Sequence, residues 1–178
     1  NWQCALAEAP FIPGLARNAE VLTMCSYAPL FAHVERWQWT PDLIWFDNLT
    51  SFGTANYYVQ KMFATNKGSR VVPLTLESKS LVGQDGLYGS AVLDESDKSL
   101  VIKLVNASAN AQSFAINLQG ASRIKSATVT TLTTSDLNAF NTIERPDQIV
   151  PTVSTLAVKG KTFTYAVPAN SFVVIRLK

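Results

Sequence analysis

From residue 69 to the C-terminus, apolar and polar residues alternate along the sequence, and this pattern limits the possible fold more than any other feature. Phe114, Ile116 and Leu118, for example, are separated by the smaller or polar Ala115 and Asn117. A period of two residues is typical of β-strands. Clusters of Gly, Asp, Asn and Ser separate the alternating runs, as turns require. We predict strands near 70–76, 88–94, 99–106, 112–119, 123–133, 153–158, 161–167 and 171–177.

About eight short strands with such turns predict an antiparallel β-sandwich, jelly-roll-like in arrangement, over residues 69–178. Residues 134–152 lack the alternation and form a long excursion, closed by Pro146 and Pro151.

The first residues of the chain have a different sequence pattern, one typical of a helix. Residues 3–17 are rich in Ala and Leu and predict a helix. Pro10 and Pro13 conflict with a regular helix, because proline removes a backbone donor and crowds the preceding turn. We therefore expect a kink, or a restart of the helix at Pro10. Residues 20–27 follow as a strand that is apolar on both faces, typical of a buried parallel strand.

A second helix is predicted over residues 54–67, with Thr54 as its N-cap and Gly68 as a left-handed C-terminal cap. The expected fold class is therefore mixed. A short α/β segment at 1–68 is followed by an all-β domain at 69–178.

The loop at 28–54 is long and rich in aromatic residues, and such loops usually carry function. Tyr27, Trp37 and Trp39 are candidate substrate-binding residues, because an aromatic ring can stack on the C–H face of a sugar. The alternative for Trp37 and Trp39 is a purely structural cover, and the two interpretations weigh about equally. Trp45 lies inside an apolar run and is expected in the core.

Several function classes are excluded by composition. The net charge is +2, which gives no electrostatic basis for binding nucleic acid or an anionic membrane. There is also no run of about 20 apolar residues that would cross a bilayer. Cys4 and Cys25 are expected to be small buried hydrophobes rather than a disulfide, and with His33 they do not form a zinc-type ligand pattern. We expect no metal and no cofactor.

No catalytic residue can be assigned from the sequence. Glu8 and Glu20 lie within a predicted helix and at the entry end of a predicted strand, where a structural or solvated role is favoured. Glu35, Asp42 and Asp47 lie in the aromatic loop, but Asp47 precedes a turn. A serine–histidine arrangement using His33 lacks a nucleophile elbow.

Four sequence segments closely resemble, in order, the end of the catalytic barrel in glycoside hydrolase family 51 α-L-arabinofuranosidases. They lie at residues 5–18, 21–34, 37–48 and 56–68. The segments at 135–151 and 168–178 are similar to the C-terminal β-domain of this family. The resemblance implies a (β/α)8 barrel followed by a β-sandwich, and hydrolysis of arabinofuranosyl groups with retention. Retention uses two carboxylates about 5–5.5 Å apart. By this alignment both glutamates lie upstream of Asn1.

By the resemblance, residues 1–68 hold the seventh helix, the eighth strand and the eighth helix of the barrel. Tyr27, Trp37 and Trp39 would form one wall of the sugar pocket. The chain alone is expected to be inactive. Expected partners are arabinose-containing glycans, the N-terminal barrel portion and a second copy of the chain. The substrate class implies a secreted or periplasmic protein. No signal peptide opens the sequence. The chain starts without a methionine and runs straight into a predicted helix, which suggests a shortened or processed form.

Without its barrel neighbours, the segment at 3–27 is expected to pack onto the β-domain or onto a second copy. The alternative function is a non-catalytic carbohydrate-binding or structural β-sandwich, although Tyr88 and Tyr165 are the only large aromatic residues of that domain beyond Phe. Two triplets, at Asn48 and Asn106, match N-glycosylation acceptors.

Overall fold

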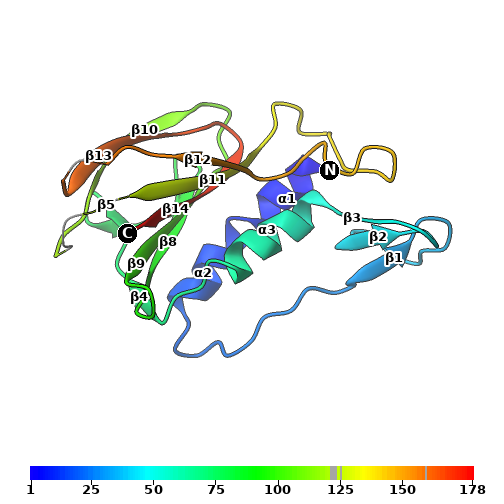
Figure 1. The fold of residues 1–178 in the computed structure, drawn as a ribbon, viewed down its shortest axis with the longest axis horizontal. Coiled ribbons are helices and arrows are strands. Elements are labelled where there is room, and N and C mark those ends of the chain that lie inside the picture. Colours follow the sequence, from blue (N-terminus) through cyan, green and yellow to red (C-terminus); the bar gives the residue numbers. More distant parts are fainter. Residues whose placement is uncertain (121–123, 125, 159) are drawn as a thin grey trace.

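The computed structural model describes residues 1–120, 124, 126–158 and 160–178, and within them the protein is mostly β-structure with a short helical region (Figure 1). The helices are α1 (Trp2–Glu8), α2 (Phe11–Arg17) and α3 (Ala55–Ala64). The strands before residue 85 are β1 (Phe31–His33), β2 (Ile44–Phe46), β3 (Ser51–Gly53), β4 (Arg70–Val72), β5 (Thr75–Leu76), β6 (Lys79–Ser80) and β7 (Val82–Gln84). The later strands are β8 (Leu87–Asp94), β9 (Ser99–Asn106), β10 (Gln112–Asn117), β11 (Ala127–Thr133), β12 (Thr152–Thr155), β13 (Thr162–Val167) and β14 (Ser171–Leu177).

The predicted antiparallel β-domain is confirmed. Its large sheet has the order β12-β11-β14-β9-β8-β4, with β7 also paired to β8, and every pair in it is antiparallel. A separate antiparallel pair, β10–β13, covers one face of this sheet. The predicted strand at 70–76 is split into β4 and β5. Residues 123 and 125 of the strand expected at 123–133 lie outside the described residues.

The large sheet is buried on both faces, which explains why β14 is apolar at nearly every position. Val173 and Ile175 point into the cluster shared with the β10–β13 pair. Phe172 and Val174 point to the opposite face, into a cluster that also contains residues of α1 and α3. Successive residues of a strand point to opposite faces of the sheet. The residues of β14 on both faces must therefore be apolar.

The helices therefore share their core with the large sheet. Trp2 of α1 is completely buried, and its indole Nε1 donates to the Asn170 carbonyl oxygen at 3.0 Å. In α3, Phe63 stacks on Phe172 of β14 with 4.5 Å between ring centroids. The expectation that the N-terminal helical segment packs onto the β-domain is thus confirmed for α1.

The predicted helix at 3–17 is two helices, and it restarts at Pro10 as expected. Pro10 is the N-cap of α2 and Pro13 lies in its first turn. The first backbone N–H groups of a helix have no intrahelical acceptor, so proline costs little there.

The second predicted helix is confirmed as α3, and the Thr54 side chain caps it by accepting from the Tyr57 N–H. The prediction for Gly68 is wrong. Side chains end this helix instead, since Thr65 Oγ1 donates to the Lys61 carbonyl at 2.7 Å and Asn66 Nδ2 to the Met62 carbonyl at 2.9 Å.

Gly68 has another structural role. A Cβ atom there would lie 2.7 Å from the Leu93 carbonyl oxygen, so glycine permits close contact with β8.

The barrel remnant predicted for residues 1–68 is not evident, and the strand expected at 20–27 does not form. Residues 20–26 are irregular and exposed, with Val21 73% and Met24 82% exposed. A strand needs a neighbour for its backbone hydrogen bonds, and none of the described residues pairs with this segment. A helix satisfies its bonds internally, which is why α1 and α2 form where the strand does not.

A small sheet that the sequence did not predict lies within the aromatic loop. β1 pairs with β2 in parallel, and β2 pairs with β3 in an antiparallel hairpin. In Figure 1 this sheet lies at the end of the molecule away from the β10–β13 pair. The excursion at 134–152 is tied to it, because Asn141 Nδ2 donates to the Gly53 carbonyl at 2.9 Å and to the Ile149 carbonyl at 3.0 Å.

Candidate functional site

The exposed aromatic residues of the loop form the candidate carbohydrate-contacting surface. Trp37 is 53% exposed and Trp39 is 64% exposed, so both indole rings are accessible to a ligand. Trp37 also makes an edge-to-face contact with Trp45 at 6.0 Å between centroids. Trp45 itself is half-buried in β2, although the sequence placed it in the core. Exposed, flat aromatic rings suit stacking on a sugar face.

Tyr27, the third predicted site residue, lies in a different environment. It is half-buried and lies near Cys4 and Glu8 of α1 and near Asp42 of the loop. Burial, and then the carboxylates of Glu8 and Asp42 and the thiol of Cys4, raise the pKa of Tyr27 to about 12. The phenol is therefore a neutral hydrogen-bond donor at neutral pH. Its proximity to two acids is a feature that the sequence did not reveal.

Two carboxylates of this region, Glu8 and Asp47, are held by hydrogen bonds to other parts of the chain. Glu8 accepts hydrogen bonds from the side-chain amides of Asn56 and Gln60 on α3, which confirms its structural role. Asp47 accepts from the Leu49 and Thr50 N–H groups, and these bonds lower its pKa.

Asp42 is nearly buried, and no described residue hydrogen-bonds its Oδ2 atom. Burial raises the pKa of Asp42. Burial therefore favours the neutral, protonated form of this carboxyl group.

A shallow cleft beside the small sheet was not predicted. It has a volume of about 290 Å³ and lies between the β2–β3 hairpin, α3 and Pro146 of the excursion. Tyr57 and Tyr58 line it in edge-to-face contact at 5.1 Å, and Lys61 lies over the Tyr57 ring at 5.6 Å. The only sequence signal was the aromatic pair at the start of the predicted helix.

The two cysteines do not behave as predicted. Cys4 and Cys25 are both free and both exposed, so the expectation that they are buried is wrong. Cys4 points away from the core-facing side of α1, and Cys25 lies in the segment that failed to form a strand. Within the described part of the chain, no group of three His, Cys, Asp or Glu side chains is arranged to hold a metal ion.

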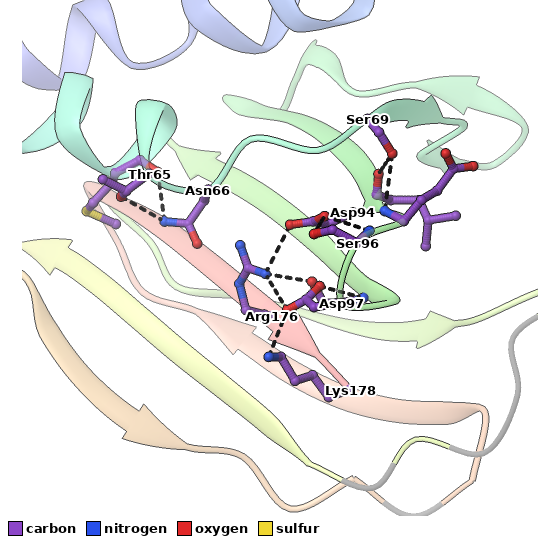
Figure 2. A network of polar contacts seen from close by, with 12 residues as sticks. Thr65, Asn66, Ser69, Asp94, Ser96, Asp97, Arg176 and Lys178 are labelled. Carbon is purple, nitrogen blue, oxygen red and sulfur yellow. Dashed lines mark hydrogen bonds and ion pairs between the residues drawn. The ribbon is translucent and has the colours of Figure 1, made fainter.

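A polar network lies away from the aromatic surface, at the end of the large sheet (Figure 2). Arg176 Nη1 contacts Asp97 Oδ2 at 3.3 Å and donates to Ser99 Oγ at 2.6 Å, and Lys178 Nζ contacts Asp97 Oδ2 at 2.7 Å. The hydrogen bonds from Lys178 and Ser99 hold the pKa of Asp97 well below its usual value. This network ties the β8–β9 turn to the last strand and is structural.

Together, these features define the chain as a β-rich domain with a short helical region and an exposed aromatic loop. No described helix is both long enough and apolar enough to span a membrane. The chain belongs to the α-L-arabinofuranosidase C-terminal domain family, which matches residues 1–171. It corresponds to a C-terminal portion of its relatives, as the resemblance implied.

Full-length relatives agree with this assignment. The chain is 32% identical to α-L-arabinofuranosidase 1 of Arabidopsis thaliana, covering 94% of the chain and 25% of that protein. It is 34% identical to a probable α-L-arabinofuranosidase A of Aspergillus terreus, covering 98% of the chain and 27% of that protein. The chain thus spans about a quarter of the length of these relatives.

A solved structure of an arabinose-bound MgGH51 α-L-arabinofuranosidase superposes on the chain with a TM-score of 0.91 and 38% identity. The match covers 100% of this chain and 28% of that one. An extracellular exo-α-L-arabinofuranosidase of Streptomyces chartreusis is 54% identical over 72 residues, which cover 40% of this chain and 9% of that protein.

Proposed function

We propose that this chain is the C-terminal part of a retaining α-L-arabinofuranosidase that releases terminal arabinofuranosyl groups from arabinose-containing glycans. The main support is the family match across residues 1–171 together with the high similarity to an arabinose-bound relative. In this proposal residues 1–68 complete a (β/α)8 barrel and residues 69–178 form its accessory β-sandwich. The exposed segment at 20–26 then supplies the missing eighth barrel strand once its neighbours are present.

The chain contributes one wall of the sugar pocket in this proposal. Trp37 and Trp39 offer accessible rings, and Tyr27 offers a neutral phenol that can donate a hydrogen bond to a sugar hydroxyl. The two catalytic glutamates come from the upstream portion. The chain on its own is therefore inactive, because retention needs both carboxylates across the scissile bond.

The test uses the full-length enzyme and a chromogenic arabinofuranoside. Trp39→Ala and Tyr27→Ala should each lower kcat/KM by about two- to tenfold, the loss expected from one stacking or hydrogen-bonding contact. Phe140→Ala is the control, because Phe140 is also an exposed aromatic residue, at 55%, but lies in the excursion. Unchanged kinetics for both site variants would remove these residues from the sugar pocket. Turnover by the 178-residue chain alone would contradict the proposal that the upstream portion supplies both catalytic glutamates.

A second candidate function is a structural module that stabilises the barrel. The observation favouring it is the helix-covered face of the large sheet, where Trp2 and Phe63 join α1 and α3 to β14. This role is compatible with the first. A pull-down of the whole chain on immobilised arabinan tests a third hypothesis, a free-standing carbohydrate-binding module. Only that hypothesis predicts that the chain is retained on the glycan.

Localisation and assembly belong to the same proposal. We place the parent enzyme outside the cytoplasm, as the name of the Streptomyces relative states for that protein. The exposed apolar segment at 20–26 is where the upstream barrel portion, or a second copy of the chain, would pack. Sedimentation of the chain at several concentrations tests self-association, and a monomer at all of them would leave only the upstream portion.

A further inference from the structure

Two triplets of the chain match the N-glycosylation acceptor pattern, and the structure places them in opposite environments. Asn48-Leu49-Thr50 forms the turn between β2 and β3, where Asn48 is exposed and Leu49 is 93% exposed. This turn projects at the end of the molecule opposite the β10–β13 pair (Figure 1). Asn106-Ala107-Ser108 begins at the last residue of β9, and Asn106 is 0% exposed.

The turn at Asn48 does not depend on the Asn48 side chain. Asp47 Oδ1 accepts from the Leu49 N–H at 2.7 Å, from the Thr50 N–H at 2.6 Å and from Thr50 Oγ1 at 3.1 Å. The Asp47 N–H also donates to the Thr50 carbonyl at 3.0 Å. None of the described residues forms a hydrogen bond with the Asn48 carboxamide. A group attached to its Nδ2 atom would therefore extend into solvent and break no native contact.

Asn106 is held in the opposite way. Its Nδ2 atom donates to the Asn110 carbonyl at 2.8 Å and to the Pro168 carbonyl at 2.9 Å. Its Oδ1 atom accepts from the Ser108 N–H at 3.0 Å and from Ser108 Oγ at 2.8 Å. A glycan on Nδ2 would replace a hydrogen that holds Asn106 in place, and it would need space beside a side chain that is 0% exposed.

We propose that Asn48 is the N-glycosylation site of this chain in a eukaryotic secretory pathway and that Asn106 is not modified in the folded protein. The donor is a polyprenyl-diphosphate-linked oligosaccharide. The Asn48 Nδ2 atom forms a bond to the anomeric carbon of the glycan, and the bond from that carbon to the diphosphate oxygen breaks. The diphosphate leaves with the electron pair, and one amide proton is lost to a base. The attached glycan shields Leu49 from solvent.

The test is expression of the full chain behind a secretion leader in yeast. The protein is treated with peptide N-glycosidase in ¹⁸O-labelled water and analysed by peptide mass spectrometry. We expect ¹⁸O-labelled Asp at position 48 and unlabelled Asn at position 106. Both secreted and cell-retained protein are analysed, so the label at positions 48 and 106 can be measured even if secretion is poor.

Matched variants distinguish this site from any other. Asn48→Gln and Thr50→Ala should each abolish the glycosidase-sensitive mobility shift, whereas Thr50→Ser should keep it because the hydroxyl remains. Asn48 and Thr50 are both exposed, so circular dichroism should show the wild-type fold for all three variants. An unlabelled Asn48, or a labelled position 106 in folded protein, would overturn the proposal. Arabinofuranosidase activity does not enter this readout, so failure of the proposed function would be seen separately.

Discussion

Replacing Trp2 tests whether the helical region and the large sheet fold as one unit. Trp2 is completely buried in the cluster formed by α1, α3 and the large sheet, and its indole donates to the Asn170 carbonyl at 3.0 Å. Truncating a buried tryptophan to alanine costs about 3–5 kcal/mol through lost transfer energy and the cavity left behind. The lost hydrogen bond accounts for about 1 kcal/mol of that sum. We therefore expect Trp2→Ala to lower the free energy of unfolding by about 4 kcal/mol.

The assay is urea unfolding followed by far-ultraviolet circular dichroism, which does not depend on the tryptophan that is removed. With a slope of about 2 kcal/mol per molar urea, the midpoint should fall by about 2 M. Trp39→Ala is the matched control. Trp39 is 64% exposed, so Trp39→Ala should change the free energy of unfolding by less than about 0.5 kcal/mol. Equal midpoints for the two variants, or a β-sheet transition that Trp2→Ala leaves unchanged, would refute the shared core.

Three further predictions concern charge and close packing. Burial lowers the pKa of Lys103 from 10.5 to about 8. Between these two pH values the unfolded chain binds more protons than the folded one, so stability rises with pH. Lys103→Met should raise the free energy of unfolding at pH 7 by roughly 1–3 kcal/mol, and this gain should vanish above pH ~10.5. The pKa of Asp97 is held below its usual 3.8, so its stabilisation is present above that pH and is lost as pH falls further; an acid titration should unfold Asp97→Asn at a higher pH than wild type. Gly68→Ala should lower the melting temperature, at a cost of about 1–3 kcal/mol, because its Cβ would lie 2.7 Å from the Leu93 carbonyl oxygen. Gly14→Ala is the control, because its Cβ would meet only the Arg17 guanidinium, at an ordinary 3.7 Å.

The strands of the β-domain could be predicted because their signal is local. The alternation at 112–118 and 171–177 corresponds to β10 and β14, and the run at 99–106 matches β9. Helix ends with a side-chain cap were also predictable, as at Thr54. The Pro10 restart followed from proline chemistry alone. Such features depend on neighbours a few residues away, which the sequence displays directly.

The candidate site was only partly predictable. The aromatic content of the loop indicated Trp37 and Trp39, and both are exposed. The sequence did not indicate that Tyr27 lies near Glu8 and Asp42, because these three residues come from separate segments. Nor did it indicate the cleft at Tyr57 and Lys61, which the excursion closes from about 85 residues away through Pro146.

The sequence by itself determined the strand periodicity, the capped helix and the family resemblance. Tertiary structure alone decided the fate of the segment at 20–27. Its apolar pattern favours a strand, but a strand exists only where another backbone supplies hydrogen bonds, and none of the described residues does so. Tertiary structure also decided which of Asn48 and Asn106 is accessible. Two triplets of the same acceptor pattern differ in accessibility, because one lies on a projecting turn and the other begins inside the β-domain. There the Pro168 carbonyl, distant in sequence, accepts from the Asn106 amide.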